Sequence, residues 1–153
     1  MSNKIIGALI LGAGYSRRFG SDKRLHNFEG STVAETTVLA YSKVFDHIRV
    51  VIRPEDDRLA DRLKNFNVEL IKSENAKCGM GYSLSDGIVN IPTNWSFIGL
   101  LDMPYIKATT LKHLKKWPSM QTILKSELFE QGTWRTLIGR LIPSVFIVLF
   151  IRS

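Results

Sequence analysis

Apolar, β-prone runs alternate with amphipathic segments along most of this 153-residue chain. The apolar runs are continuous, as expected for strands buried on both faces, and the segments between them repeat apolar residues at helical intervals. Strands separated by single helices need crossover connections, which favour a mostly parallel sheet covered by helices. The sequence therefore predicts an α/β fold. We expect strands at residues 4–11, 47–54, 68–73 and 96–103, and helices at residues 31–45, 55–66, 81–91 and 107–117.

Composition narrows the class of protein. The chain is 44% hydrophobic, which suits one globular domain spanning residues 1–153. Its one cysteine, Cys78, leaves no internal disulfide and indicates a reducing compartment, so we expect a cytoplasmic protein. No apolar run approaches the roughly 20 residues that a transmembrane helix needs.

The net charge of +7 is unevenly distributed along the chain. Residues 1–106 carry 13 Lys and Arg against 12 Asp and Glu, whereas residues 107–153 carry 8 against 2. A nucleic-acid-binding protein more often spreads a basic face through its folded body. We therefore expect neither a nucleic acid nor a membrane as a partner.

Three stretches rich in glycine or polar residues follow predicted strands, at residues 12–23, 75–81 and 102–104. Ligands of parallel α/β sheets bind at the carboxyl ends of the strands, near the point where the strand order reverses. We therefore expect these three stretches to meet in one site.

The first of these stretches combines glycines with positive charge. Gly12 and Gly14 permit a tight turn with exposed N–H groups, which can donate to a phosphate or a base edge. Arg18 and Lys23 add charge that suits a phosphate. The spacing matches neither the dinucleotide-binding G-x-G-x-x-G pattern nor a Walker A loop. A strand-end turn with solvated basic residues is the alternative for this stretch alone.

Residues 11–23, LGAGYSRRFGSDK, are similar to the signature L-A-A-G-x-S-x-R-M-G-x-x-K. Residues 78–84, CGMGYSL, resemble G-M-x-x-S-L, and residues 101–104, LDMP, resemble G-D-M-P. In this order, the three motifs resemble those of the MobA-like NTP transferases, the nucleotidyltransferases of molybdenum-cofactor maturation and their relatives. The resemblance covers about residues 5–115. It implies a Rossmann-like three-layer α/β/α sandwich of the nucleotide-diphospho-sugar transferase-like type.

The resemblance also implies roles for individual residues. Arg18 and Lys23 would neutralise the triphosphate and Asp102 would hold Mg²⁺, so these three are the implied catalytic residues. Mg²⁺ prefers hard oxygen ligands and needs only one or two protein carboxylates beside phosphate and water. Taken alone, Asp102 could equally be a turn or helix-capping residue, and Ser83 could equally be a helix cap. The implied nucleotide-binding residues are Leu11, Gly12, Ala13, Gly14, Ser16, Arg18, Lys23, Gly79 and Ser83.

The implied reaction is nucleotidyl transfer, in which a phosphate of an organic acceptor attacks the α-phosphorus of an NTP and pyrophosphate leaves. Ala13 and the segment 79–84 resemble the cytidylyl branch of the family more than the guanylyl branch, which favours CTP over GTP and molybdopterin as the acceptor. The acceptor phosphate is already anionic, so we expect no general base among the histidines and no catalytic thiol at Cys78. A molybdoenzyme or its chaperone would be the implied protein partner. A sugar-phosphate or isoprenoid-phosphate acceptor is the alternative, although the isoprenoid branch normally has Pro-Lys-Gln where residues 22–24 read Asp-Lys-Arg.

Residues 131–153 are atypical for the family. Its members typically contain a G-H-P segment and a second metal-binding aspartate near the C-terminus, and neither occurs in this sequence. Read one base further on, codons for residues 132–136 can give Glu-Arg-Gly-Gly-His, so a shifted reading frame is one explanation and a divergent short member is the other. A nucleotide-binding protein without turnover is therefore an alternative to an enzyme. Residues 144–151, SVFIVLFI, are long enough for a buried strand.

Overall fold

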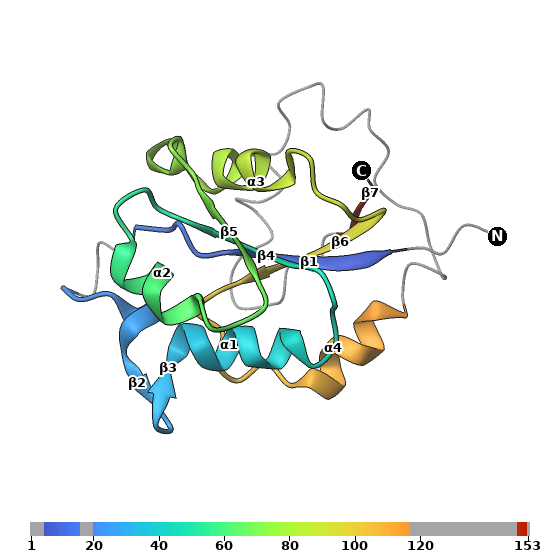
Figure 1. The fold of residues 1–153 in the computed structure, drawn as a ribbon, viewed down its shortest axis with the longest axis horizontal. Coiled ribbons are helices and arrows are strands. Elements are labelled where there is room, and N and C mark those ends of the chain that lie inside the picture. The colour runs from blue at the N-terminus through green and yellow to red at the C-terminus, as the bar shows by residue number, and fades with distance from the viewer. Residues whose placement is uncertain (1–4, 16–19, 117–149, 153) are drawn as a thin grey trace.

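A computed structural model describes residues 5–15, 20–116 and 150–152 of the chain (Figure 1). All four predicted strands and all four predicted helices are present, with ends that differ from the predicted ones by a few residues. In chain order, the elements are β1 (Ile6–Leu11), the 3₁₀ helix η1 (Lys23–Leu25), β2 (Asn27–Phe28), β3 (Ser31–Thr32), α1 (Val33–Ser42), β4 (Ile48–Ile52), α2 (Asp57–Leu63), β5 (Glu69–Lys72), the 3₁₀ helix η2 (Ala76–Cys78), α3 (Met80–Ile88), β6 (Trp95–Leu100), α4 (Ala108–Lys115) and β7 (Phe150–Arg152).

Strand β1 lies at the centre of a five-stranded sheet with the order β5-β4-β1-β6-β7. It pairs in parallel with β4 on one side and with β6 on the other, so that Ala8 lies beside both Ile48 and Phe97. Strand β4 also pairs in parallel with β5, whereas β7 pairs with β6 in the antiparallel direction. The predicted mostly parallel sheet is confirmed. Because the strand order reverses at β1, its carboxyl end is the place at which such sheets bind ligands.

Helices cover both faces of the sheet, with α3 on one face and α1, α2 and α4 on the other (Figure 1). The larger apolar core lies between the sheet and these three helices, and it includes Val38, Tyr41 and Phe97. The smaller core lies under α3 and includes Leu9 and Leu84. Both faces of the central strands are therefore buried, as the continuous apolar runs predict. The three-layer α/β/α architecture is confirmed.

Helix α1 begins with a capping box formed by Thr32 and Glu35. The Glu35 N–H donates to Thr32 Oγ1 at 3.2 Å, and the Thr32 N–H donates to the Glu35 carboxylate at 2.8 Å. These two bonds satisfy backbone donors that the first helical turn leaves free. The buried face of α1 then carries Tyr41 against the sheet, where an ideal Cβ on Gly99 would lie 1.9 Å from the Tyr41 hydroxyl oxygen. The glycine in β6 therefore makes room for the tyrosine.

Between β1 and α1 the chain forms two elements that the sequence analysis did not predict, the 3₁₀ helix η1 and the β2–β3 hairpin. The hairpin turns at Glu29 and Gly30, whose φ angles of 50° and 85° lie in the left-handed region. Phe28 in the hairpin contacts Tyr105 edge-on, with 5.1 Å between the ring centroids. This contact brings the hairpin beside the segment that follows Asp102.

The apolar C-terminal run is described only at its end. Strand β7 overlaps the last part of the predicted strand at residues 144–151, and residues 144–149 lie outside the described part of the chain. None of the helices in the described ranges is long and apolar enough to cross a bilayer.

Candidate active site

A cavity of about 380 Å³ lies at the carboxyl ends of β1 and β6. It brings together the glycine turn after β1, the segment that leads into α3 and the aspartate after β6. These are the three stretches that the sequence predicts to meet. The lining residues are Leu11, Gly12, Ala13, Gly14, Tyr15, Arg24, Ala76, Lys77, Gly79, Met80, Ser83, Leu100, Leu101 and Asp102.

Backbone hydrogen bonds fix the start of the glycine turn. The Gly12 N–H donates to the Val51 carbonyl at 2.7 Å, and the Leu101 N–H donates to the Leu11 carbonyl at 3.0 Å. These bonds extend the sheet pairing beyond the strand ends and hold the first motif beside the third. Gly14, in contrast, is exposed, and no described atom lies within 4 Å of an ideal Cβ at this position. A ligand can therefore approach the backbone closely at Gly14.

The N-terminus of α3 also faces the cavity. Gly79 is the N-cap residue, with a φ of 125° that disfavours any residue with a Cβ, and it offers no side chain to cap the helix. The free N–H groups of a first turn and the helix dipole both favour a bound anion. Ser83 is buried within this helix and lines the cavity. The alternative reading of Ser83 as a helix cap is therefore wrong, since Gly79 holds that position.

Asp102 lies in the turn that follows β6, and its side chain is exposed at the cavity. The N-cap of the next helix, α4, is Lys107, so Asp102 is not a helix cap. Within the described ranges, no group of three or more His, Cys, Asp or Glu side chains is placed to hold a metal ion. One carboxylate nevertheless fits Mg²⁺, which completes its coordination with phosphate oxygens and water. Asp102 is the cavity residue that could hold such an ion.

Among the cationic residues predicted for the site, the one that the structure describes does not line the cavity. Ser16 and Arg18 lie outside the described residues. Lys23 is half-buried in η1 and is not a lining residue of the cavity. Two cations that sequence reasoning missed, Arg24 and Lys77, do line it. Arg24 directly follows the motif residue Lys23, and Lys77 lies two residues before the motif residue Gly79. This proximity to the motifs was the signal available in the sequence.

Arg24 is 5% exposed and uses all five of its N–H donors. Its Nε and Nη2 donate to the Asp22 carboxylate at 2.8 and 2.5 Å, and its Nη1 and Nη2 donate to the Asp56 carboxylate at 2.6 and 2.7 Å. The remaining Nη1–H donates to the Gly12 carbonyl. Burial raises the pKa of Asp22 and of Asp56, but the hydrogen bonds and positive charges of Arg24 and Arg53 together outweigh burial and hold each pKa below its ordinary value. Both aspartates are therefore charged partners of the arginine.

The rim of the cavity contains an aromatic side chain from the same loop. The Tyr15 hydroxyl donates to Glu55 at 2.9 Å, and the Arg53 guanidinium lies over the Tyr15 ring at 5.0 Å from its centroid. Arg53 in turn pairs with the Asp56 carboxylate at 2.7 Å. The loop after β1 is thus joined to the loop after β4 at two places.

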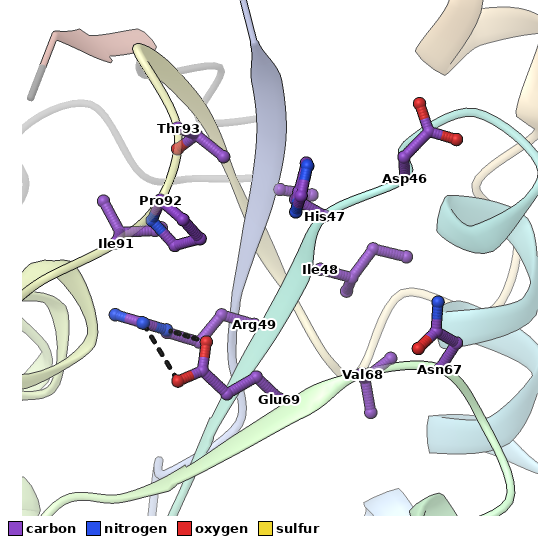
Figure 2. A pocket seen from close by; sticks show the side chains of 11 residues that line it. Asp46, His47, Ile48, Arg49, Asn67, Val68, Glu69, Ile91, Pro92 and Thr93 are labelled. Carbon is purple, nitrogen blue, oxygen red and sulfur yellow. Dashed lines mark hydrogen bonds and ion pairs between the residues drawn. The ribbon is translucent and has the colours of Figure 1, made fainter.

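A second cavity, of about 250 Å³, lies at the opposite, amino ends of β4 and β5. Figure 2 shows Arg49 and Glu69 facing each other across these two strands, with guanidinium–carboxylate distances of 2.8 and 3.0 Å. The other Arg49 N–H groups donate to the carbonyls of Gly87, Val89 and Asn90 at the end of α3. All five N–H donors of Arg49 are therefore used in contacts between elements of the fold. Because this guanidinium has no donor left for a ligand, we place the candidate site in the first cavity.

Residues 8–122 match the family model of the MobA-like NTP transferase domain. The chain belongs to the MobA-like NTP transferase family. The match includes all three motifs and every lining residue of the first cavity. Family membership and the three-layer fold confirm the resemblance that the motifs indicate.

Known proteins similar to this MobA-like domain include one curated relative and several solved structures. The probable molybdenum cofactor guanylyltransferase of Natranaerobius thermophilus is 27% identical over 107 residues, which cover 70% of this chain and 52% of that protein. A nucleotidyl transferase from Methanothermobacter thermautotroptrophicus has a TM-score of 0.67 at 23% identity, covering 73% of this chain and 57% of that one. Rv0371c of Mycobacterium tuberculosis H37Rv, in complex with manganese, has a TM-score of 0.57 at 18% identity, covering 75% and 60%. The structural likeness establishes the fold, and the chain spans about half the length of the curated relative it matches.

Most of the nucleotide-binding residues that the motifs imply in this MobA-like domain share one cavity with Asp102. Their roles stay predictions. The implied residues that line the cavity are Leu11, Gly12, Ala13, Gly14, Gly79 and Ser83.

Proposed function

We propose that this domain transfers a nucleoside monophosphate from an NTP to a phosphorylated acceptor. The observation that supports this function is the meeting of the glycine turn, the N-terminus of α3 and Asp102 in one cavity. A metal–triphosphate ligand needs backbone donors, positive charge and a carboxylate for the metal, all facing the same space. The turn and α3 supply the donors, Lys77 supplies charge and Asp102 supplies the carboxylate.

In the proposed reaction, an oxygen of the acceptor phosphate attacks the α-phosphorus of the NTP. The bond between the α-phosphorus and the α–β bridging oxygen breaks, and that oxygen leaves with pyrophosphate. Because the attacking phosphate is an anion, no side chain has to remove a proton. The domain would act by aligning the two phosphates and neutralising their charge.

Each part of the cavity would have one task in this alignment. The backbone at Gly14 and the first turn of α3 would donate to phosphate oxygens, and Lys77 would add charge beside the predicted Arg18 and Lys23. Asp102 would hold Mg²⁺, which neutralises phosphate charge when bound. The manganese complex of Rv0371c, a protein of the same fold, supports a divalent ion in this role.

We propose CTP as the preferred nucleotide and molybdopterin as the acceptor. Ala13, whose motif position favours CTP, is 2% exposed and lines the cavity. The curated relative is named as a guanylyltransferase of the molybdenum cofactor, which supports the acceptor and makes GTP the competing nucleotide. A cytoplasmic location and a molybdoenzyme or chaperone partner belong to the same proposal.

A nucleotide-binding protein without turnover is the second candidate. One observation favours it: among the described residues, Asp102 is the one carboxylate that lines the cavity, and a second metal ligand would have to come from elsewhere. Nucleotide binding depends on the cavity just described, whereas turnover would need the remaining metal ligand or a substitute. The two candidates therefore differ in pyrophosphate release and not in nucleotide affinity.

The test begins with titration of the four NTPs into the full chain, with Mg²⁺ and with a chelator. We expect Mg²⁺-dependent binding that is tightest for CTP, and Asp102→Asn should weaken it by about tenfold or more. The matched control is Asp61→Asn, which removes a carboxylate that is 75% exposed on α2 and should leave affinity unchanged. Pyrophosphate release on addition of molybdopterin then separates an enzyme from a binder. Wild-type affinity in Asp102→Asn would show that the site assignment is wrong.

A further inference from the structure

We propose that Arg24 is a positioning residue that fixes the glycine turn in the conformation that binds the nucleotide. The inference rests on the proposed function, because it gives the nucleotide site a residue that acts through Gly12. Arg24 lines the cavity, yet four of its five donors go to Asp22 and Asp56 and the fifth goes to the Gly12 carbonyl.

The contact with Gly12 orients a whole peptide group. The Gly12 carbonyl and the Ala13 N–H belong to one planar trans peptide, so they point in opposite directions. Holding the carbonyl toward Arg24 therefore directs the Ala13 N–H away from the guanidinium. The other side of Gly12 is fixed as well, since its own N–H donates to the Val51 carbonyl at 2.7 Å. Both peptide groups of Gly12 are thus set before a ligand arrives, and prior ordering of this kind lowers the cost of binding.

The charges around Arg24 indicate that it acts by orienting the backbone and not by attracting a phosphate. Arg24 and Arg53 together face the carboxylates of Asp22 and Asp56, so the cluster of four has no net charge. Asp56 is 6% exposed, and it also accepts the Arg53 N–H at 2.8 Å. Its carboxylate is therefore held by the loop after β4. A guanidinium that is already paired with two carboxylates adds little net attraction for a phosphate. Its contribution is the fixed direction of the remaining donor.

Lysine cannot replace arginine in this arrangement. An ammonium carries its three donors on one nitrogen, whereas the planar guanidinium spreads five donors over three nitrogens. A lysine at position 24 would keep the charge but could not reach two carboxylates and the Gly12 carbonyl together. Arg24→Lys should therefore release the Gly12 peptide group while the positive charge at position 24 is kept.

Arg49 provides a matched control. It is also 5% exposed and also uses five donors, at the opposite end of the sheet. Two of them go to Glu69 (Figure 2), and three go to carbonyls at the end of α3. Arg49→Lys should cost the fold a similar amount of stability without touching the glycine turn. If the two variants then differ in nucleotide affinity, the difference comes from the glycine turn and not from a general loss of stability.

The experiment measures three quantities on the full-length wild type, Arg24→Lys and Arg49→Lys: the Kd for Mg·CTP and Mg·GTP, the urea midpoint, and amide exchange at residues 11–15 by NMR. We expect Arg24→Lys to weaken both nucleotides by about tenfold or more, and to speed exchange at these amides, while Arg49→Lys keeps Kd within about twofold. Equal losses of affinity in the two variants, or none in Arg24→Lys, would overturn the proposal.

A second variant keeps the proposal testable if Arg24→Lys does not fold. Asp56→Asn retains Arg24 but removes one negative charge, so a charge-based role predicts tighter binding of the triphosphate, whereas a positioning role predicts weaker binding. Tighter binding would overturn the proposal. If the wild type binds no nucleotide at all, the proposed function fails. Amide exchange at residues 11–15 then decides separately whether Arg24 holds the turn.

Discussion

Leu101 occupies the space in which a side chain on Gly12 would begin. An ideal Cβ at Gly12 lies 2.4 Å from Leu101 Cδ2 and 3.2 Å from the Val51 carbonyl oxygen. Leu101 is fully buried and directly precedes Asp102. One packing contact therefore sets the spacing between the glycine turn and the aspartate on the far side of the candidate site.

This contact predicts that Gly12 and Gly14 respond differently to alanine. Gly12→Ala should lower the free energy of unfolding by about 1–3 kcal/mol, because Leu101 and the Val51 carbonyl cannot both move aside. At Gly14 no described atom lies within 4 Å of a Cβ, so Gly14→Ala should change stability by no more than about 1 kcal/mol. Urea denaturation measures both values, and the Kd for Mg·NTP should rise in Gly14→Ala because the ligand approaches there. Equal stability losses in the two variants would contradict this prediction.

Lys77 should contribute to nucleotide affinity. It is an exposed lysine that lines the cavity just before the N-terminus of α3. We expect Lys77→Ala to raise the Kd for Mg·NTP by about three- to tenfold, and to make binding less sensitive to salt, because one cation near the phosphates is lost. Lys64→Ala, on the surface of the opposite layer, is the control and should leave affinity and its salt dependence unchanged. Titration calorimetry at two ionic strengths checks both variants.

The Tyr41 hydroxyl should be a source of instability. It is buried against β6, and among the described residues it has no hydrogen-bond partner. Burial raises the pKa of Tyr41, since the ionised form would be unsolvated there. Tyr41→Phe should therefore raise the free energy of unfolding by about 1 kcal/mol. The control is Tyr82→Phe at an exposed position, which should change stability very little, and a destabilised Tyr41→Phe would contradict the prediction.

The aspartates of the Arg24 cluster should make the fold sensitive to acid. The pKa values of Asp22 and Asp56 lie below the ordinary value of 3.8. A carboxylate with a lowered folded pKa stabilises the protein above its unfolded pKa, and this stability is lost as pH falls through the folded pKa. Stability should therefore fall between about pH 5 and pH 2, with a smaller slope in Asp56→Asn. Urea midpoints across this range test the slope, and Asp61→Asn should follow the wild type.

The sequence could predict the layers because each of them has a local pattern. Continuous apolar runs and helical periodicity depend on neighbouring residues, so the presence and order of β1, β4, β5 and β6 could be predicted, although their ends differ by a few residues. The β2–β3 hairpin was not, because strands of two residues have no periodicity to detect. Its turn residues, Glu29 and Gly30, resemble those of many loops.

The candidate site was only partly predictable for a related reason. Motif positions placed the glycine turn and Asp102 at neighbouring strand ends, and the structure brings them into one cavity. The partners of Arg24 include Asp56, 32 residues away, and those of Arg49 lie 20 to 41 residues away. Pairings at such separations depend on the folded sheet and leave no local signature. A buried arginine therefore looks like any surface cation in the sequence.

The fixed peptide groups at Gly12 have a practical consequence for redesign. A library intended to change the base of the proposed nucleotide should hold Gly12, Arg24 and Leu101 constant, because these residues fix the backbone of the glycine turn. Diversity belongs at the rim, at Tyr15 and Met80, where both side chains border the cavity and lie at least partly in solvent. Selectivity could then be evolved without first having to rescue folding.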